Sequence, residues 1–359
     1  MKSITELDNL KDVRVLVRLD LNVPIDAAGH VVDDFRIRKS LPIINYLIQK
    51  GANIILMSHI ENNKKEKISL EPVARHLKNL GVDCFFEKNY KKVLTDTHKV
   101  IFLENLRMHD GEEKNDKKFA KELASLADIY VNEAFSVSHR EHASVSAITE
   151  FIPSYAGFQF ENEVKELAKV FQPEHPFIFI LGGAKFETKL PLVDKFINIA
   201  DKVFIGGALA NDFFRAQGKD IGDSLVSNPA PDLSKFLNSP KLMLPVDHVF
   251  KGTAIMDVGM KTTELLRKEV EKAKYILWNG PVGAYEGGYR VATLEIAEMI
   301  AEATSKGAKS FVGGGDTLAT IAELKLEDSF TFVSTGGGAM LDYLAKGTLP
   351  GIEALKNNK

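Results

Sequence analysis

Glycine-rich turns follow four apolar runs in the second half of the chain. The runs and their turns are Phe177–Leu181 with Gly182-Gly183, Lys202–Ile205 with Gly206-Gly207, 310–312 with Gly313-Gly314-Gly315, and 330–333 with Gly336-Gly337-Gly338. A strand that ends in glycines and opens into a helix presents unpaired backbone N–H groups at the positive end of the helix dipole, which suits a phosphate. One such turn can equally serve close packing between a strand and a helix. Four of them, with Lys185 and Lys189 after the first, predict phosphate binding in this half.

The common nucleotide-binding fingerprints are absent from these turns. The nearest approach to the Walker pattern, Gly259-Met260-Lys261-Thr262, lacks the glycine before its lysine. The dinucleotide pattern fails because Leu318 and Leu341 stand where a small residue is required. The sequence therefore predicts a nucleotide-binding domain of another kind.

Polar side chains, in place of glycines, follow the apolar runs of the first half. They are Asp20 and Asn22 after the first run, His59 after the second, Glu104, Asn105 and Arg107 after the third, and Asn132 and Glu133 after the fourth. Ligands of an open parallel sheet bind outside the carboxyl ends of its strands, so these side chains are expected to converge on one crevice. Arg36, Arg38, Arg107 and Arg140 add guanidinium groups suited to a phosphate or a carboxylate. Each arginine alone is typical of a solvated surface, and the placement after strands is what favours an anion site.

Metal ligation by histidines is not expected in this half. His139 and His142 lie three residues apart, but no third ligand of a suitable type accompanies them in the sequence. His59, at the end of a strand, is the better candidate for a contact with a ligand.

Apolar runs that alternate with helical patterns must position these side chains. In the first half the runs are 13–17, 54–57, 100–103 and 129–131, and helical spacing is found at 37–49, 70–80 and 116–126. Strands that alternate with helices predict parallel sheets with helices on both faces. The predicted fold class is α/β, with two doubly wound, Rossmann-like domains. They are residues 1–160 and 173–338, joined by an interdomain helix at 161–172 that has helical spacing and ends at Gln172-Pro173.

Composition excludes several classes of protein. Among 359 residues, 46 Lys and Arg oppose 49 Asp and Glu, and this net charge of −3 argues against nucleic-acid binding through bulk positive charge. Cys84 is the only cysteine, so neither an internal disulfide nor a cysteine zinc cluster can form. Neither a targeting segment nor a membrane-spanning segment is evident. We expect a cytoplasmic monomer without nucleic-acid or membrane partners.

The motifs together resemble those of phosphoglycerate kinases. They occur in family order along essentially the whole chain, at 17–24, 33–38, 104–107, 134–140, 181–189, 278–281, 312–317 and 334–339. This family transfers a phosphoryl group between 1,3-bisphosphoglycerate and MgADP, giving 3-phosphoglycerate and MgATP. The resemblance also implies that the tail, residues 339–359, packs back on the first domain.

The resemblance implies roles for individual residues. The glycerate would be held by Asp20, Asn22, Arg36, His59, Arg107 and Arg140, and the nucleotide by Lys189, Gly206, Gly207, Glu286, Gly313, Gly314, Gly315, Asp316 and Thr317, with Asp316 near Mg²⁺. Arg36 and Lys185 would stabilise the charge of the transferred phosphoryl group, assisted by the helix start at Gly336, Gly337 and Gly338. Such a site needs no general base, because the acceptor oxygen is already ionised at neutral pH. Both charges must meet one phosphoryl group, so the two domains are expected to close when both ligands are bound.

Three departures from the family pattern are visible. The family's Ser-His-Leu-Gly-Arg-Pro run is here Ser58-His59-Ile60-Glu61-Asn62-Asn63, so Asn62 replaces a substrate arginine. Thr188 replaces an aspartate before the second lysine, and the region 226–262 is shorter than usual. Two alternatives therefore stay open: a catalytically weakened kinase-fold binding protein, and another acyl-phosphate kinase on a related two-domain frame. The retained set of Arg36, Lys185, Lys189 and Asp316 favours an active phosphoglycerate kinase.

Overall fold

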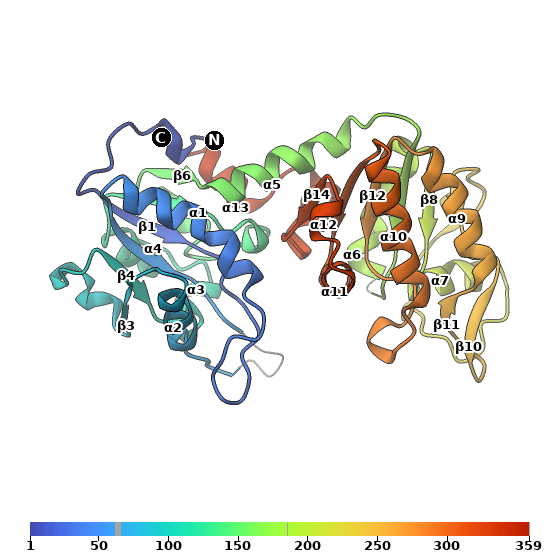
Figure 1. The fold of residues 1–359 in the computed structure, drawn as a ribbon, viewed down its shortest axis with the longest axis horizontal. Helices are drawn as coiled ribbons and strands as arrows, with labels where there is room; N and C mark the ends of the chain where they lie inside the picture. The colour runs from blue at the N-terminus through green and yellow to red at the C-terminus, as the bar shows by residue number, and fades with distance from the viewer. Residues whose placement is uncertain (62–65, 185, 359) are drawn as a thin grey trace. The chain divides into compact units, whose positions relative to one another are not determined.

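The chain forms two compact units, each built on one six-stranded sheet. The computed structural model describes residues 1–61, 66–184 and 186–358. The first unit comprises Met1–Lys165 and Thr348–Lys359, and the second comprises Glu166–Gly347. The strands of both six-stranded sheets pair in parallel, with helices packed against them (Figure 1). The predicted α/β class with two parallel sheets is confirmed.

The first unit carries a sheet of spatial order β3-β4-β2-β1-β5-β6. Its strands are β1 (Arg14–Arg18), β2 (Asn53–Met57), β3 (Phe85–Glu87), β4 (Val100–Leu103), β5 (Ile129–Asn132) and β6 (Ser154–Ala156). Its helices are α1 (Phe35–Gln49), α2 (Glu71–Asn79), α3 (Asp110–Glu113), α4 (Lys117–Ala124) and α13 (Pro350–Lys356). The chain leaves β1 toward β2 on one side and later returns to β5 on the other. The carboxyl ends of β1 and β5 therefore flank the point where the strand order reverses, the usual ligand crevice of such sheets.

Alternating side chains of this sheet form one face of the first core. Val15, Val17, Ile54, Leu56 and Phe102 are all buried in it, two residues apart along each strand as a pleated strand requires. The apolar faces of α1 and α2 cover them through Ile37, Ile43, Ile44, Leu47, Val73, Ala74 and Leu77. Because these side chains are buried, the strands that end in the polar loops are fixed in the packed core.

The second unit repeats the plan with the order β14-β13-β12-β7-β8-β9. Its parallel strands are β7 (Phe177–Leu181), β8 (Lys202–Ile205), β9 (Leu242–Met243), β12 (Tyr275–Asn279), β13 (Lys309–Gly313) and β14 (Phe332–Ser334). A separate antiparallel hairpin is formed by β10 (His248–Lys251) and β11 (Ala254–Val258). Its helices are α6 (Phe186–Ile199), α7 (Ala208–Ala216), α8 (Ser234–Leu237), α9 (Met260–Lys272), α10 (Val291–Ser305), α11 (Gly315–Leu324) and α12 (Gly338–Lys346).

Trp278 occupies the centre of the second core. It is fully buried, and it packs in one cluster with Ile178 and Ile180 of β7 and with Ile296 and Ile300 of α10. The other face of the sheet is aromatic, because Phe177 and Phe179 lie against Phe196 of α6. With both faces covered by helices, the strands read as continuous apolar runs.

Several predicted boundaries differ from the observed ones. The helix predicted at 161–172 is α5 (Phe158–Ala168) followed by a 3-10 turn at Lys169–Phe171, and the division between the compact units falls inside α5. The predicted tail at 339–359 is too long, since α12 belongs to the second unit and the return to the first begins at Thr348. The helix α12 stays with the second unit, where its Tyr343 packs against Phe171. Among the residues that the structure describes, none of the helices is long and apolar enough to cross a membrane.

Candidate active site

Asp20 connects the carboxyl ends of β1 and β5 in the first unit. Its Oδ2 accepts hydrogen bonds from Nη1 of Arg36 at 2.7 Å and from Oγ of Ser136 at 2.5 Å. Arg36 stands in the first turn of α1, and Ser136 follows β5. The aspartate thereby holds a guanidinium at the crevice. Asn22 belongs to the same loop, because its N–H donates to Oδ1 of Asp20 at 3.3 Å.

His59 is buried and bonded to a residue that the sequence did not suggest. Nη2 of Arg18, itself fully buried in β1, lies 3.2 Å from Nδ1 of His59. Since a guanidinium can only donate, Nδ1 is the acceptor and the ring carries its proton on Nε2. Burial, followed by the charges of Arg18, Arg107, Arg140 and Arg36, holds the pKa of His59 well below its usual 6.5. His59 is therefore a neutral ring at physiological pH.

A buried acidic group compensates the charge of Arg18. Nε of Arg18 donates to Oγ of Ser144 at 2.9 Å, and this hydroxyl donates to Oε1 of Glu112 at 2.5 Å. The other oxygen of Glu112 accepts from the N–H of Ser144 at 3.0 Å. A buried guanidinium is tolerated because an opposite charge and hydrogen bonds accompany it. A charged residue inside an apolar strand was the available signal for Arg18, whereas no spacing signal joins Ser144 to Glu112.

Arg107 and Arg140 share one acidic neighbour. Nη2 of Arg107 lies 3.9 Å from Oε2 of Glu61, and Nη1 of Arg140 lies 3.5 Å from Oε1 of the same carboxylate. Arg107 also forms an ion pair with Glu113, and its side chain is only 8% exposed, against 39% for Arg140. The edge of the sheet thus gathers guanidinium groups from the first turn of α1, from the 3-10 turn after β4 and from the segment after β5.

Arg38 does not join this cluster. It lies on α1 with its side chain 59% exposed, and it pairs with Asp34 at 2.9 Å one helical turn earlier. Two residues along a helix separate Arg38 from Arg36 by about 200° around the axis, so the two arginines project from different faces.

Histidine ligation of a metal finds no support in the described ranges. No group of three or more His, Cys, Asp or Glu side chains able to hold a metal is found there. Burial, with the charges of Arg107 and Arg140, lowers the pKa of His142 to about 3, so this ring is neutral.

Three loops of the second unit, those after β7, β12 and β13, are bonded together at the carboxyl edge of its sheet. Gly182 N–H donates to the carbonyl of Asn279 at 2.9 Å, and Gly183 N–H donates to that of Pro281 at 2.7 Å. Nδ2 of Asn279 donates to the carbonyl of Gly313 at 2.7 Å, and Gly280 N–H donates to Oγ1 of Thr317 at 2.9 Å. Thr317, predicted to bind nucleotide, is thus fully buried and ties α11 to the β12 loop.

Gly207 must be glycine for these loops to approach each other. Its φ is +62°, and a Cβ at this position would lie 2.7 Å from the backbone nitrogen of Gly183 and 2.9 Å from the carbonyl oxygen of Pro281. An L-residue is strained at this φ, and the surrounding atoms are backbone that cannot move aside.

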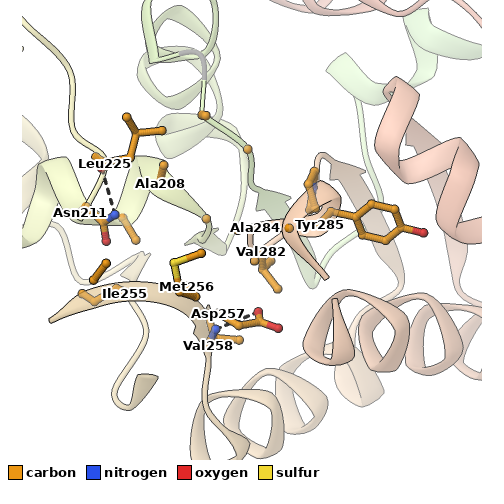
Figure 2. Close-up of a pocket in the computed structure, with 18 of the residues that line it drawn as sticks. Ala208, Asn211, Leu225, Ile255, Met256, Asp257, Val258, Val282, Ala284 and Tyr285 are labelled. Atoms are coloured by element: carbon orange, nitrogen blue, oxygen red, sulfur yellow. Dashed lines mark hydrogen bonds between the residues drawn. The ribbon is translucent and has the colours of Figure 1, made fainter. Parts of the chain in front are cut away.

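A pocket of about 470 Å³ opens beside these loops. Figure 2 shows Ala208 and Asn211 of α7 facing Met256 and Asp257 of β11, with Val282 and Tyr285 on the β12 side. The volume falls in the range of small-ligand sites, and apolar side chains make up much of the wall. Gly207, Glu286 and Asp316 of the predicted nucleotide set line this pocket.

The remaining predicted residues of the second unit that the structure describes do not line the pocket. Gly206 is buried at the end of β8, and Lys189 is buried on α6 with Nζ donating to the carbonyl of Gly182. Gly313, Gly314 and Gly315 lead from β13 into α11, where Asp316 is exposed in the first turn. Gly336, Gly337 and Gly338 lead from β14 into α12, and Gly338 is exposed at the helix start. Lys185 and Asn62 lie outside the described residues.

The apolar wall of the pocket was missed from the sequence. The wall is formed by a loop that carries Leu225 and by the hairpin strand β11 with Ile255, Met256 and Val258. No glycine-rich turn follows β11, so the motif used for the other loops does not identify it. Alternation is weak in the short run Ala254–Val258, so only the neighbouring Gly252 turn could have signalled a hairpin. Asp257 has a raised pKa of about 6 because the carboxyl is buried at the edge of this wall.

Two parallel sheets, one with arginines at its carboxyl edge and the other with glycine loops beside a pocket, define a two-unit α/β protein with sites suited to phosphorylated ligands. The sequence matches the phosphoglycerate kinase family model over residues 4–347. The chain therefore belongs to the phosphoglycerate kinase family. Its activity is the glycolytic phosphoryl transfer of that family, and it is an ATP-binding transferase.

Relatives and solved structures match over nearly the whole chain. The phosphoglycerate kinase of Thermosipho africanus is 40% identical over 399 aligned positions, covering 100% of this chain and 99% of the relative. That of Dictyoglomus turgidum is 41% identical over 395 positions, covering 99% of each. The structure of phosphoglycerate kinase from Coxiella burnetii is 33% identical with a TM-score of 0.84 and covers 99% of each chain. That from Pyrococcus horikoshii is 28% identical with a TM-score of 0.83, covering 99% of this chain and 98% of the other.

The alignment also bears on the length of this chain. An alignment of 399 positions against 359 residues leaves at least 40 positions without a residue here. Both large sheets nevertheless have six strands each.

Proposed function

We propose that the first unit binds 3-phosphoglycerate or 1,3-bisphosphoglycerate and that the second unit binds MgATP or MgADP. The observation that carries this division is the contrast between the two sheet edges. One edge gathers Arg36, Arg107 and Arg140 beside Asp20, and the other surrounds a pocket of about 470 Å³ with glycine loops. A small acid phosphate suits the first edge, and a nucleotide suits the second.

We assign each part of the glycerate substrate to side chains whose hydrogen-bonding groups match it. Arg107 and Arg140 provide fork-shaped donors for the phosphate, and Arg36 provides one for the reacting carboxyl phosphate. Asp20 and Asn22 offer oxygen acceptors for a hydroxyl, and His59 offers its Nε2 proton. Their support is the shared position at or near the carboxyl ends of β1, β2, β4 and β5.

The nucleotide contacts are assigned along the pocket. The apolar wall of Ile255, Met256 and Val258 suits the base, and Glu286 at the rim suits the ribose hydroxyls. Gly314 and Gly315 at the start of α11, with Lys189, suit the phosphates because a helix start presents backbone N–H groups and the lysine adds a cation. The N–H groups of Gly206 and Gly207 already donate to the carbonyls of Leu181 and Val282, so this loop would contribute a close approach of its backbone to the nucleotide.

Asp316 is the residue that fits Mg²⁺. It is exposed at the pocket, and no described side chain holds its carboxylate. Mg²⁺ in nucleotide sites is usually bound by one or two carboxylates together with the phosphates, so a single aspartate is sufficient. When bound, the ion would neutralise charge on the nucleotide phosphates.

Catalysis then consists of positioning and charge stabilisation. Arg36 and Lys185 would stabilise the equatorial oxygens of the phosphoryl group, and the start of α12 at Gly336–Gly338 would add backbone N–H groups. No side chain needs to take a proton, since the acceptor is an ionised carboxylate or phosphate. Transfer requires the two bound substrates to meet, so we expect closure when both are present.

A coupled assay with 3-phosphoglycerate and MgATP tests the proposal. The expected result is turnover that depends on both substrates. Binding of both substrates without turnover would support the weakened binding protein that the Asn62 and Thr188 departures suggest. Turnover with another carboxylic acid but not with 3-phosphoglycerate would support the other acyl-phosphate kinase.

We also propose that the protein acts as a cytoplasmic monomer. The glycolytic family and the single buried thiol of Cys84 support a reducing compartment, and burial raises the pKa of that thiol to about 11. Light scattering coupled to size exclusion should give a mass near 39.7 kDa. Twice that mass would contradict the monomer.

A further inference from the structure

One carboxylate, that of Glu61, lies between two arginines of the proposed glycerate site. Its Oε1 is 3.5 Å from Nη1 of Arg140, and its Oε2 is 3.9 Å from Nη2 of Arg107. The N–H of Glu61 donates to Oδ1 of Asn22 at 3.2 Å, so the backbone that carries this carboxylate is anchored to the loop after β1. In the family run that this segment resembles, the same position is glycine, which offers no charge.

We propose that Glu61 is a specificity-determining residue that competes with the substrate phosphate for Arg107 and Arg140. This inference rests on the proposed placement of glycerate in the first unit. Carboxylates and phosphates are recognised by the same N–H groups of a guanidinium, so both cannot occupy them fully. The phosphate must displace Glu61 on binding, and the anchored backbone keeps the displaced carboxylate close to an anion of the same sign.

Other carboxylates of the cluster do not have this effect on both arginines. Glu113 pairs with Arg107, but its side chain is 65% exposed and it can turn into solvent at little cost. Asp20 holds Arg36 with a 2.7 Å bond, and among the described residues it forms no ion pair with Arg107 or Arg140. Among the described ion pairs, Glu61 is the carboxylate that reaches two of the expected phosphate-binding arginines.

The competition from Glu61 should weaken the binding of every anion at this site, and it should weaken some anions more than others. The proposed substrate gains further contacts from Asp20, Asn22 and His59, and these remain when Glu61 is displaced. A small inorganic anion such as sulfate gains only the contacts with the arginines. Glu61 therefore removes a larger share of the binding of sulfate than of 3-phosphoglycerate.

Direct binding to the full chain tests this inference without relying on turnover. Glu61→Gln keeps the shape and removes the charge, and we expect the Kd for 3-phosphoglycerate in calorimetry to fall about threefold to tenfold, the size of one or two partly exposed ion pairs. The Kd for sulfate should fall by a larger factor, and the Kd for MgADP should not change. Glu61→Gly, which also removes the side chain, should tighten 3-phosphoglycerate in the same direction.

Glu113→Gln is the matched control, because it removes a carboxylate that contacts Arg107 alone; its Kd for 3-phosphoglycerate should change less than twofold. An unchanged or raised Kd in Glu61→Gln, with circular dichroism unaltered, would overturn the inference, since Glu61 would then have no effect on binding or would help to position the arginines.

Arg140→Ala separates this failure from failure of the proposed site. If Arg140→Ala also leaves the affinity for 3-phosphoglycerate unchanged, the placement of glycerate itself is wrong.

Discussion

Each guanidinium assigned to the glycerate site already has an acidic partner within the first unit. Arg36 has Asp20, Arg107 has Glu113 and Glu61, and Arg140 has Glu61. These pairs hold flexible side chains near their working positions, which lowers the entropy that a ligand must remove. They also reduce the net positive charge that attracts an anion. The balance between these two effects differs from one arginine to the next, because only Arg36 is held by a short bond to a largely buried carboxylate.

Arg36 is therefore the residue whose loss we expect to cost most. Arg36→Ala should lower turnover by about 10² or more, the usual loss for one preorganised donor that stabilises developing charge. Arg38→Ala is the matched control on the same helix, because Arg38 is exposed and paired with Asp34. Steady-state kinetics with circular dichroism as a folding check measures both variants. Equal turnover for Arg36→Ala and Arg38→Ala would contradict the assigned role.

At this scale, the sequence predicted residues that follow strands and missed those inside them. The position of a polar residue after an apolar run is enough to place Asp20, Arg107 or Asn22 at the carboxyl edge of a parallel sheet. The buried group of Arg18, Ser144 and Glu112 could not be predicted, because its members come from β1, a loop and α3 and meet only in the folded unit. Arg38 was grouped wrongly with Arg36, since proximity in sequence does not place two side chains on one helical face.

At the scale of elements, α5 begins on a buried carboxyl group. Oε1 of Glu133 accepts from the N–H of Gln159 at 3.0 Å, and the N–H of Phe160 donates to the same carboxyl. Glu133 is 3% exposed, and its Oε2 has no partner among the described residues. Burial, opposed by these two bonds, raises the pKa of Glu133 from 4.5 to about 8. The helix that spans the division between the units thus starts on a group that is protonated near neutral pH.

Glu133 should make the first unit less stable as the pH rises. The folded state keeps its proton up to about pH 8, whereas the unfolded chain releases it near pH 4.5, so this contribution is lost between those values. Glu133→Gln removes the titration, and its free energy of unfolding relative to the unmodified chain should rise by about 2–4 kcal/mol from pH 5 to pH 8.5. Urea unfolding followed by far-UV circular dichroism measures this. A difference that stays constant with pH would show that Glu133 is ionised in the folded state.

The elements themselves were predicted where an apolar run is long and bounded. β7 and β8 were predicted with their observed limits. The helix predicted at 116–126 is α4, which Asp116 caps because its side chain accepts from the N–H of Phe119 at 2.7 Å. The edge strands β3, β6 and β9 have only two or three residues each, too few for a periodic signal. Their positions depend on the pairing offered by a neighbouring strand, which is a tertiary effect.

At the scale of the molecule, each of the two cores contains a different large buried aromatic side chain. Trp278 is the only tryptophan of the sequence, and it is fully buried in the second unit. The first unit has Tyr130 as its largest buried aromatic side chain. Tryptophan fluorescence therefore reports the unfolding of the second unit, while far-UV circular dichroism reports both units together.

This division gives a test of which unit binds which substrate. A ligand that binds only the folded form stabilises it, by about 2.7 kcal/mol at a hundredfold excess over Kd, or roughly 1 M in urea midpoint for a protein of ordinary m-value. MgADP should therefore raise the urea midpoint of the transition that Trp278 fluorescence reports. In contrast, 3-phosphoglycerate should leave that midpoint unchanged and should raise the midpoint of the first unit, which is seen only in circular dichroism. Arg140→Ala, as the control, should lose the effect of 3-phosphoglycerate and keep that of MgADP. A rise of the Trp278 midpoint with 3-phosphoglycerate as large as that with MgADP would show that the substrates are not divided between two independently folding units.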